Sequence, residues 1–365
     1  YKLNDKEREK HFTAFARGDS PFLIGARSAL FVPAKNIGLI IVDEEHESSF
    51  KQEEAPSYHL RDMAVLYASI LNIPVILGSA TPSVESMYNA SIGKYSLHEI
   101  NDRHNSARLP QIKIIDMKKT DMIGNMIAEP IYDKIAETVS KNEQAIILLN
   151  RKGYTTSLYC SECGEAAVCL NCSVGIVYFK SKNKCVCRYC GAEYDRPSCA
   201  SCGGVNFREW GAGTEKADEF LNEMFPNKII RIDTDNSSSV KTLSKQLKRF
   251  EEKEANVLVG TQLVAKGLHF PSVTFVGVLG IDSILALPDF RATERAYQLL
   301  VQVAGRAGRE RLNGQVYIQT MNPHSHIFKF IEKSDNAFYR WELDRRKAIR
   351  YPPYGKLARL ILSYM

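Results

Sequence analysis

Short apolar runs alternate along the chain with segments whose apolar residues recur at helical spacing. The helical pattern covers Tyr58–Leu71, Val240–Glu252 and Ala292–Ala304. The apolar runs, which predict buried strands, are Ile37–Val42, Pro74–Leu77, Gln144–Leu149, Lys228–Ile232, Asn256–Val259, Val273–Leu279 and Gln315–Gln319. Strands that are apolar throughout are typical of parallel sheets with helices on both faces. The pattern therefore predicts an α/β protein whose ligands bind at loops after the carboxyl ends of strands.

These elements divide into two sheets, one within residues 1–115 and one within residues of about 128–335. The second sheet is interrupted at 158–205 by a cysteine-rich insert, and the polar stretches 101–109 and 118–125 have the composition of linkers. With domains of roughly 150 residues, a chain of 365 residues predicts two or three domains.

The composition is that of a globular protein, with 44% apolar and 25% charged residues and a formal charge of +6. It excludes a disordered chain or a coiled coil. No apolar run reaches the ~18 residues that span a bilayer, and no basic-then-apolar leader is present. No membrane association and a cytoplasmic location are therefore expected. The sequence begins at Tyr1 and ends at Met365 in the middle of its pattern of helices and strands, so we expect it to be a piece of a longer protein.

All nine cysteines lie within a stretch of 43 positions that starts at Cys160. Eight of them form four C-x-x-C pairs: Cys160/Cys163, Cys169/Cys172, Cys187/Cys190 and Cys199/Cys202. Two such pairs can close a tetrahedral Cys₄ zinc site, so eight ligands predict two Zn²⁺. Four thiolates leave no position for water, so the role of the metal is structural. Disulfides are the alternative, but they suit secreted chains.

Two points about the cysteines stay open. Nested pairing would join the outer pairs, Cys160/Cys163 with Cys199/Cys202, and leave the inner pairs for a second zinc; sequential pairing is the alternative. Cys185 fits no pair and is interpreted as a free structural thiol. Each Zn²⁺ with four thiolates carries a charge of −2, so two sites would lower the formal charge from +6 to about +2. The net charge is then weak support for nucleic-acid binding.

An acidic motif, Asp43-Glu44-Glu45-His46, follows the first apolar run directly. Paired carboxylates at a strand end suit nucleotide hydrolysis, with one acid on Mg²⁺ and the next activating water. The following strand ends in Gly78-Ser79-Ala80-Thr81-Pro82, whose hydroxyl groups could hydrogen-bond to the acidic loop. An acidic turn without function is the alternative for each motif taken alone.

The third chemical motif runs from Gln302 to Arg309 at the end of a predicted helix. Arg306 and Arg309 are three residues apart and would share a helix face. Guanidinium groups placed in this way suit capture of γ-phosphate oxygens. Together the three motifs predict a nucleotide-driven motor in which Asp43 and Arg306 meet across a crevice.

These motifs resemble those of superfamily 2 helicases. The similarity covers motif II (DEEH), motif III (GSATPS), motif V (GTQLVAKGLHFPSVTFVG) and motif VI (QVAGRAGR). The eight-cysteine insert narrows the resemblance to the PriA family of bacterial replication-restart helicases. The resemblance implies two RecA-like lobes, the first truncated, with a zinc-binding insert. The implied parts are a partial lobe 1 (1–115), a linker with the start of lobe 2 (116–157), the insert (158–205), the rest of lobe 2 (206–335) and the start of a C-terminal domain (336–365).

The resemblance also implies roles for individual residues. Asp43 would coordinate Mg²⁺, Glu44 would act as general base, and Arg306, Arg309 and Gln302 would act on the γ-phosphate of ATP. His46 and Gly267 are further candidates for nucleotide contact. For DNA, the candidates are Arg27, Ser28, Phe50, Lys51, Tyr58, His59, Thr261, Gln262 and Lys266.

Some of these residues have a plainer interpretation. Tyr58 and Leu60 could begin a helix packed on the sheet, Thr261 could cap a strand, and Lys266 could serve the nucleotide.

The implied function is an ATP-dependent 3′-to-5′ DNA helicase at stalled or forked DNA. Its implied partners are single-stranded and forked DNA, primosome proteins and single-strand-binding proteins, and a monomer is expected. The family's N-terminal DNA-binding domain and phosphate loop, G-x-x-x-x-G-K-[ST], are missing here. This stretch alone is therefore expected to hydrolyse ATP hardly at all. The alternatives are an RNA helicase or repair translocase, and a non-catalytic zinc-stabilised module that binds DNA or a partner.

Overall fold

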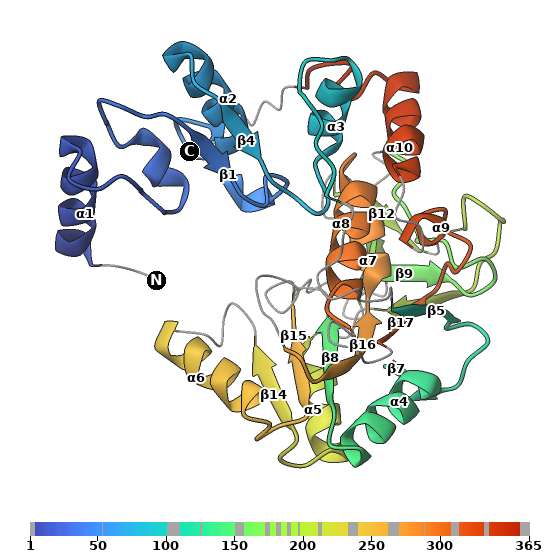
Figure 1. Ribbon diagram of the computed structural model, residues 1–365. Helices are drawn as coiled ribbons and strands as arrows, with labels where there is room; N and C mark the ends of the chain where they lie inside the picture. Colours follow the sequence, from blue (N-terminus) through green and yellow to red (C-terminus); the bar gives the residue numbers. More distant parts are fainter. Residues whose placement is uncertain are drawn as a thin grey trace. The chain divides into compact units, whose positions relative to one another are not determined.

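The computed structural model describes residues 4–52, 54–100, 110–124, 126–149, 157–171, 176–179, 184–187, 191–195, 198–210, 214–232, 240–261, 270–287, 289–307, 314–331 and 336–357. The chain separates into two compact units, Tyr1–Leu97 and His98–Met365 (Figure 1). No helix in the described part is both long and apolar enough to cross a membrane.

The first unit is built on a short parallel pair of strands, β1 (Ile40–Val42) and β4 (Val75–Leu77). Its other elements are α1 (Asp5–Arg17), 3₁₀ turns at Arg27–Phe31 and Ser48–Phe50, the antiparallel pair β2 (Lys51–Gln52) and β3 (Tyr58–His59), α2 (Leu60–Leu71) and α3 (Val84–Ser91). Helix α2 ends where Asn72 adopts a left-handed conformation (φ 54°), which asparagine tolerates better than most residues. The chain can therefore turn directly into β4.

The second unit contains a six-stranded parallel sheet in the order β14-β15-β8-β16-β17-β5. Its strands are β5 (Gln111–Asp116), β8 (Gln144–Leu149), β14 (Ile229–Ile232), β15 (Val257–Gly260), β16 (Val273–Leu279) and β17 (Gln315–Thr320). The accompanying helices are α4 (Glu129–Ser140), α5 (Thr214–Met224), α6 (Val240–Glu251), α7 (Ile281–Leu285), α8 (Ala292–Ala304), α9 (Phe328–Ile331) and α10 (Ala337–Ala348). Ile147 on β8, Phe275 on β16 and Ile131 on α4 are fully buried in its core.

The cysteine-rich insert has an antiparallel sheet in the order β12-β11-β10-β9-β13. The strands are β9 (Ser157–Cys160), β10 (Val177–Phe179), β11 (Lys184–Val186), β12 (Glu193–Tyr194) and β13 (Phe207–Trp210). A small hydrophobic cluster that includes Leu158, Ile176 and Cys185 fills the insert. So small a core buries little apolar surface, which is the reason to expect metal to contribute to folding.

Two predicted boundaries are wrong. Residues 1–115 were assigned to the first sheet, but β5 is the edge strand of the second sheet, where it pairs with β17. The insert extends beyond 205, because β13 pairs with β9. In each case the partner is far away in sequence, so local composition could not reveal it.

The predicted linker at 118–125 is also structured in part, since β6 (Met122–Ile123) pairs with β7 (Ile127–Ala128). The α/β class, the parallel sheet and the cysteine-rich insertion are confirmed.

Candidate functional site

The acidic motif and the small-residue hydroxyl motif lie side by side at the carboxyl ends of β1 and β4. The Gly78 N–H donates to the Val42 carbonyl (2.8 Å), and the Glu45 N–H donates to the Gly78 carbonyl (3.0 Å). A hydrogen bond of 2.7 Å joins His46 Nδ1 to Ser79 Oγ. The predicted contact between the two loops is therefore present.

Asp43 and Glu44 present their carboxylates to solvent at this edge. Glu44 has a left-handed backbone (φ 50°), a conformation that costs a non-glycine residue about 1–2 kcal/mol. Its N–H donates to Asp43 Oδ1 (2.9 Å), and its Oε2 lies 3.5 Å from His46 Nδ1. The tight turn places two acids next to each other, both accessible to a cation and a water molecule.

Glu45 has the opposite environment, with only 1% of its surface exposed. Its Oε1 accepts from the Ser83 N–H (2.6 Å), and its Oε2 accepts from Ser83 Oγ (3.1 Å) and Arg61 Nη1 (3.3 Å). Burial lowers the pKa of Arg61, but the carboxylates of Asp62 and Glu45 outweigh it and raise the pKa overall. The guanidinium therefore stays charged and ties α2 to both motifs.

No sequence motif predicted this network. Arg61 follows the aromatic residues Tyr58 and His59 in the sequence, which suggests an exposed cation, but the side chain is buried. The available signal was Ser83, which lies at the start of a helical segment. It is the N-cap of α3, where its hydroxyl accepts from the Ser86 N–H.

The DNA candidates of the first unit lie in two places. Arg27 and Ser28 begin a 3₁₀ turn, whereas Phe50 to His59 span the β2–β3 pair. Tyr58 stacks edge-on against Phe31, with 5.2 Å between ring centroids. Leu60 begins α2 and is buried, as the helix-start interpretation predicts, whereas Tyr58 lies on β3 before the helix. Burial lowers the pKa of His59, and the positive charge of the neighbouring Arg61 lowers it further. DNA contact by these residues stays a prediction.

In the second unit, Gln302 lies on α8 and Arg306 follows it. Helix α8 ends at Ala304, so Arg306 lies just beyond the helix. Its sharing of a helix face with Arg309 stays a prediction. Thr261 is buried directly after β15, which fits the strand-cap interpretation. Gln262, Lys266, Gly267 and Arg309 lie outside the described residues.

The outer cysteine pairs come together. The Sγ atoms of Cys160, Cys163, Cys199 and Cys202 all lie within 4.8 Å of one another. The distances are 3.6 Å from Cys160 to Cys202 and 3.4 Å from Cys163 to Cys199. A tetrahedral zinc site with bonds of ~2.3 Å would separate its sulfurs by about 3.8 Å, so the cluster fits Zn²⁺. The nested pairing is therefore the arrangement of these four residues.

A glycine directly follows the second cysteine of each outer pair and forms a tight turn there. Gly164 and Gly203 adopt φ values of 82° and 75°, and each donates its N–H to the carbonyl of the first cysteine of its pair. Burial raises the pKa of the Cys199 thiol, but the N–H groups of Cys202 and Ser201 outweigh it and bring the pKa down to about 7. A thiol with this pKa readily supplies the thiolate that a metal requires.

The inner set is described only in part, because Cys172 and Cys190 lie outside the described residues. Cys169 Sγ lies 3.1 Å from Tyr194 Oη, and Cys187 belongs to the same hydrophobic cluster as Cys169. Cys185 is buried in that cluster, and burial raises the pKa of its thiol, as expected for a structural residue. A second zinc stays a prediction.

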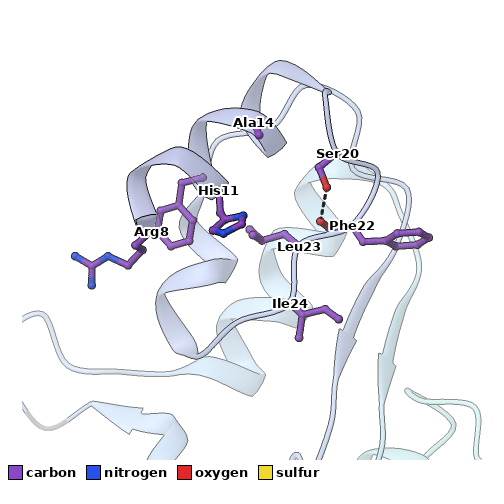
Figure 2. A pocket seen from close by; sticks show the side chains of 8 residues that line it. Arg8, His11, Ala14, Ser20, Phe22, Leu23 and Ile24 are labelled. Carbon is purple, nitrogen blue, oxygen red and sulfur yellow. Dashed lines mark hydrogen bonds between the residues drawn. The ribbon is translucent and has the colours of Figure 1, made fainter. Parts of the chain in front are cut away.

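A hollow of about 230 Å³ lies between α1 and residues 20–24 of the first unit (Figure 2). Arg8 and His11 are the charged or titratable side chains among its lining residues, and Ser20 Oγ donates to the Phe22 carbonyl (2.9 Å) at its rim. Its lining contains no carboxylate or thiol, so it offers no set of anionic metal ligands.

Residues 205–311 match the family model for the helicase conserved C-terminal domain. Over 99% of its length the chain is 40% identical to the replication restart protein PriA of Bacillus subtilis and 40% identical to that of Chlamydia pneumoniae. Identity to PriA of Haemophilus influenzae is 38% over 96% of the chain. The resemblance to the PriA family is confirmed. The chain spans about half the length of these PriA proteins. It covers 46% of the Bacillus subtilis protein, 49% of the Chlamydia pneumoniae protein and 48% of the Haemophilus influenzae protein.

Among solved structures, RecG bound to a three-way DNA junction matches with a TM-score of 0.49 and 15% identity, covering 97% of this chain and 36% of RecG. This likeness is too distant to bear on function. The PriA similarity extends over both motifs of the first unit and over the cysteine-rich insert, so all the candidate residues above lie within the matched region.

Proposed function

We propose that the chain is part of an ATP-dependent 3′-to-5′ DNA helicase that acts at stalled or forked DNA in replication restart. The observation that carries the proposal is the pair of exposed acids, Asp43 and Glu44, at the carboxyl end of a parallel strand. They lie in a sequence that is 40% identical to PriA along 99% of its length. Such a protein works on chromosomal DNA and would act in the bacterial cytoplasm.

In this proposal ATP binds with Mg²⁺, which supplies charge neutralisation on the phosphate oxygens. Asp43 would hold the cation, and Glu44 would orient and deprotonate water. The hydrogen bond between His46 and Ser79 would transmit changes in the acidic loop to the following loop. Gln302, Arg306 and Arg309 would approach the γ-phosphate, and His46 and Gly267 would contact the nucleotide.

The DNA contacts would come from Arg27, Ser28, Thr261, Gln262 and Lys266, with Phe50, Lys51, Tyr58 and His59 stacking on unpaired bases or pairing with phosphate. Two structural zinc ions would hold the insert. The outer ion would bind the cluster described above, and the inner ion would bind Cys169, Cys172, Cys187 and Cys190. Primosome and single-strand-binding proteins would be the protein partners of a monomer.

The test uses a longer protein that contains this sequence and a phosphate loop. Unwinding is measured on forked DNA with a 3′ or a 5′ tail and on RNA duplexes, together with ATP turnover and DNA affinity. The proposal predicts unwinding of 3′-tailed forked DNA. Asp43→Ala and Glu44→Ala should abolish turnover while DNA binding survives.

Turnover that persists in both variants would contradict the assignment of the acids. Preference for RNA would favour a different helicase of the superfamily, and DNA binding without turnover would favour a zinc-stabilised binding module. We also expect the 365-residue chain alone to show hardly any ATPase activity.

A further inference from the structure

The outer cysteine cluster contacts the rest of the second unit through one of its two halves. A Cβ atom added to Gly164 would lie 2.1 Å from the Met321 carbonyl oxygen, far inside contact distance. Gly203 occupies the same position in the other half and has nearly the same φ, yet no atom lies within 4 Å of an added Cβ. The turn at 160–165, here called the knuckle, is therefore pressed against the loop after β17.

Polar and apolar contacts surround this close approach. Lys118 Nζ donates to the Cys163 carbonyl (3.2 Å), and Asn322 Nδ2 donates to Glu165 Oε1 (3.2 Å). Met117, Tyr159 and Met321 form a separate buried cluster, each 3–4% exposed. The residues contacted by the knuckle or by Tyr159 just before it (Met117, Lys118, Met321 and Asn322), here called the seat, directly follow β5 and β17. Figure 1 shows β9, which leads into the knuckle, beside these strands.

The seat is bonded in turn to a buried carboxylate. The Met321 N–H donates to Asp282 Oδ2 (3.2 Å), and Thr320 Oγ1 donates to Asp282 Oδ1 (2.5 Å). Asp282 is 4% exposed and lies on α7, which packs on α8. A buried carboxylate is costly without such donors, so the position of Met321 matters to the loop that carries Asp282.

We propose that the outer metal site anchors the cysteine-rich insert to the second unit, and that metal occupancy there positions Met321 and Asp282 at the carboxyl edge of the sheet. The inference rests on the proposed zinc site. A bound metal holds both halves of the cluster and fixes the knuckle against the seat. Without the metal, no ion joins the four thiols, and the knuckle loses the constraint that holds Gly164 against Met321.

The inner set gives a contrast within the same insert. Cys169 and Cys187 pack in the hydrophobic cluster of the insert, with Tyr194 and Ile176. Neither belongs to the cluster of Met117 and Met321. Metal at the inner set should therefore leave the seat unaffected.

The first experiment compares Gly164→Ala with Gly203→Ala in this chain. Both variants add the same atom to a left-handed turn of the same cluster, but only Gly164→Ala would collide with the seat. Zinc content is measured first, and then the rate of zinc release to a chromogenic chelator. Contacts around the ligands of a metal site change its affinity roughly 10–100-fold. We expect Gly164→Ala to release the outer zinc faster than Gly203→Ala by a factor of that order.

The second experiment removes one metal at a time with Cys202→Ser (outer) and Cys187→Ser (inner). Hydrogen exchange is followed at Met117 and Met321, whose N–H groups donate to the Thr320 carbonyl (3.1 Å) and to Asp282. Cys202→Ser should remove the protection of both amides, and Cys187→Ser should retain it.

The outcomes separate the inference from the proposals beneath it. If the unchanged chain binds no zinc, the metal site and the anchor both fail. If zinc binds but the two glycine variants release it alike, or the two cysteine variants protect the seat alike, the anchor is overturned while the zinc site stands. None of these measurements uses ATP or DNA, so the helicase proposal is tested independently.

Discussion

Arg346 on α10 is a side chain whose loss should strongly destabilise the second unit. It is 1% exposed and lies between two buried carboxylates. Its Nη2 donates to Glu294 Oε2 on α8 (2.6 Å), its Nε donates to Glu342 Oε1 (3.0 Å), and its Nη1 donates to the Pro352 carbonyl (3.2 Å). Arg346→Met keeps much of the side-chain volume but removes every one of these donors.

The magnitude follows from what remains after the substitution. Glu294 and Glu342 are 4% and 2% exposed, so both carboxylates would lose their common counter-charge without gaining water. Breaking a buried ion pair from one side typically lowers the free energy of unfolding by about 3–5 kcal/mol. At roughly 2–4 °C per kcal/mol for a domain of this size class, Tm should fall by about 6–20 °C.

The adjacent residue supplies the control. Arg345 also donates to Glu342 (3.2 Å), but the Arg345 side chain is 52% exposed whereas Glu342 is 2% exposed. Solvent screens the exposed guanidinium, so this pair should contribute about 1 kcal/mol, the upper end of the range for exposed pairs. Urea unfolding of Arg346→Met and Arg345→Met should therefore differ by more than 2 kcal/mol, an order-of-magnitude expectation. Adding Glu294→Gln to Arg346→Met should recover part of the loss, because one unpaired carboxylate disappears. Equal unfolding midpoints for the two arginine variants would refute the reasoning.

Three further outcomes are expected. Glu45→Gln should lower the free energy of unfolding by about 2–4 kcal/mol, since it weakens the partner of a buried guanidinium, whereas Glu44→Gln should change it by under about 0.5 kcal/mol; urea titration measures both. Cys163→Ser should lose one zinc per chain by elemental analysis, and Cys185→Ser none. His59 has its pKa lowered from 6.5 by burial, so the neutral form is favoured in the fold. Stability should fall as pH drops below about 6.5, and His59→Gln should remove that dependence in thermal unfolding.

The strands whose limits were predicted most closely are those buried on both faces. Gln144–Leu149 and Val273–Leu279 are mostly apolar and buried throughout, and the observed strands have these same limits. Gln111–Asp116 was not recognised, because an edge strand alternates polar and apolar residues and its partner lies some 200 positions later. Pairing over such a separation depends on the whole fold and leaves no local pattern.

The same distinction applies to the candidate site. The C-x-x-C spacing predicted the cluster, because the ligands of such a metal site lie in short local motifs. The pairing of Cys160 with Cys202 had to come from the fold. Arg61 shows how a local pattern can mislead. A cation next to aromatic residues suggests an exposed surface, but the side chain is buried because it donates to Glu45, which lies far away in the sequence.

The adjacent acids of the acidic motif have two different roles, one in chemistry and one in holding the fold, which the sequence alone does not distinguish. Asp43 and Glu44 are exposed, with Glu44 in a strained turn, whereas the adjacent Glu45 is buried and bonded to α2 and α3. A strained, solvent-facing carboxylate can keep its position only if its neighbours are fixed, and Glu45 is the neighbour that provides this fixing. Substitutions one position apart should thus differ in kind. Changes at Glu44 should act on chemistry at nearly constant stability, and changes at Glu45 should act on chemistry only through the loss of the turn.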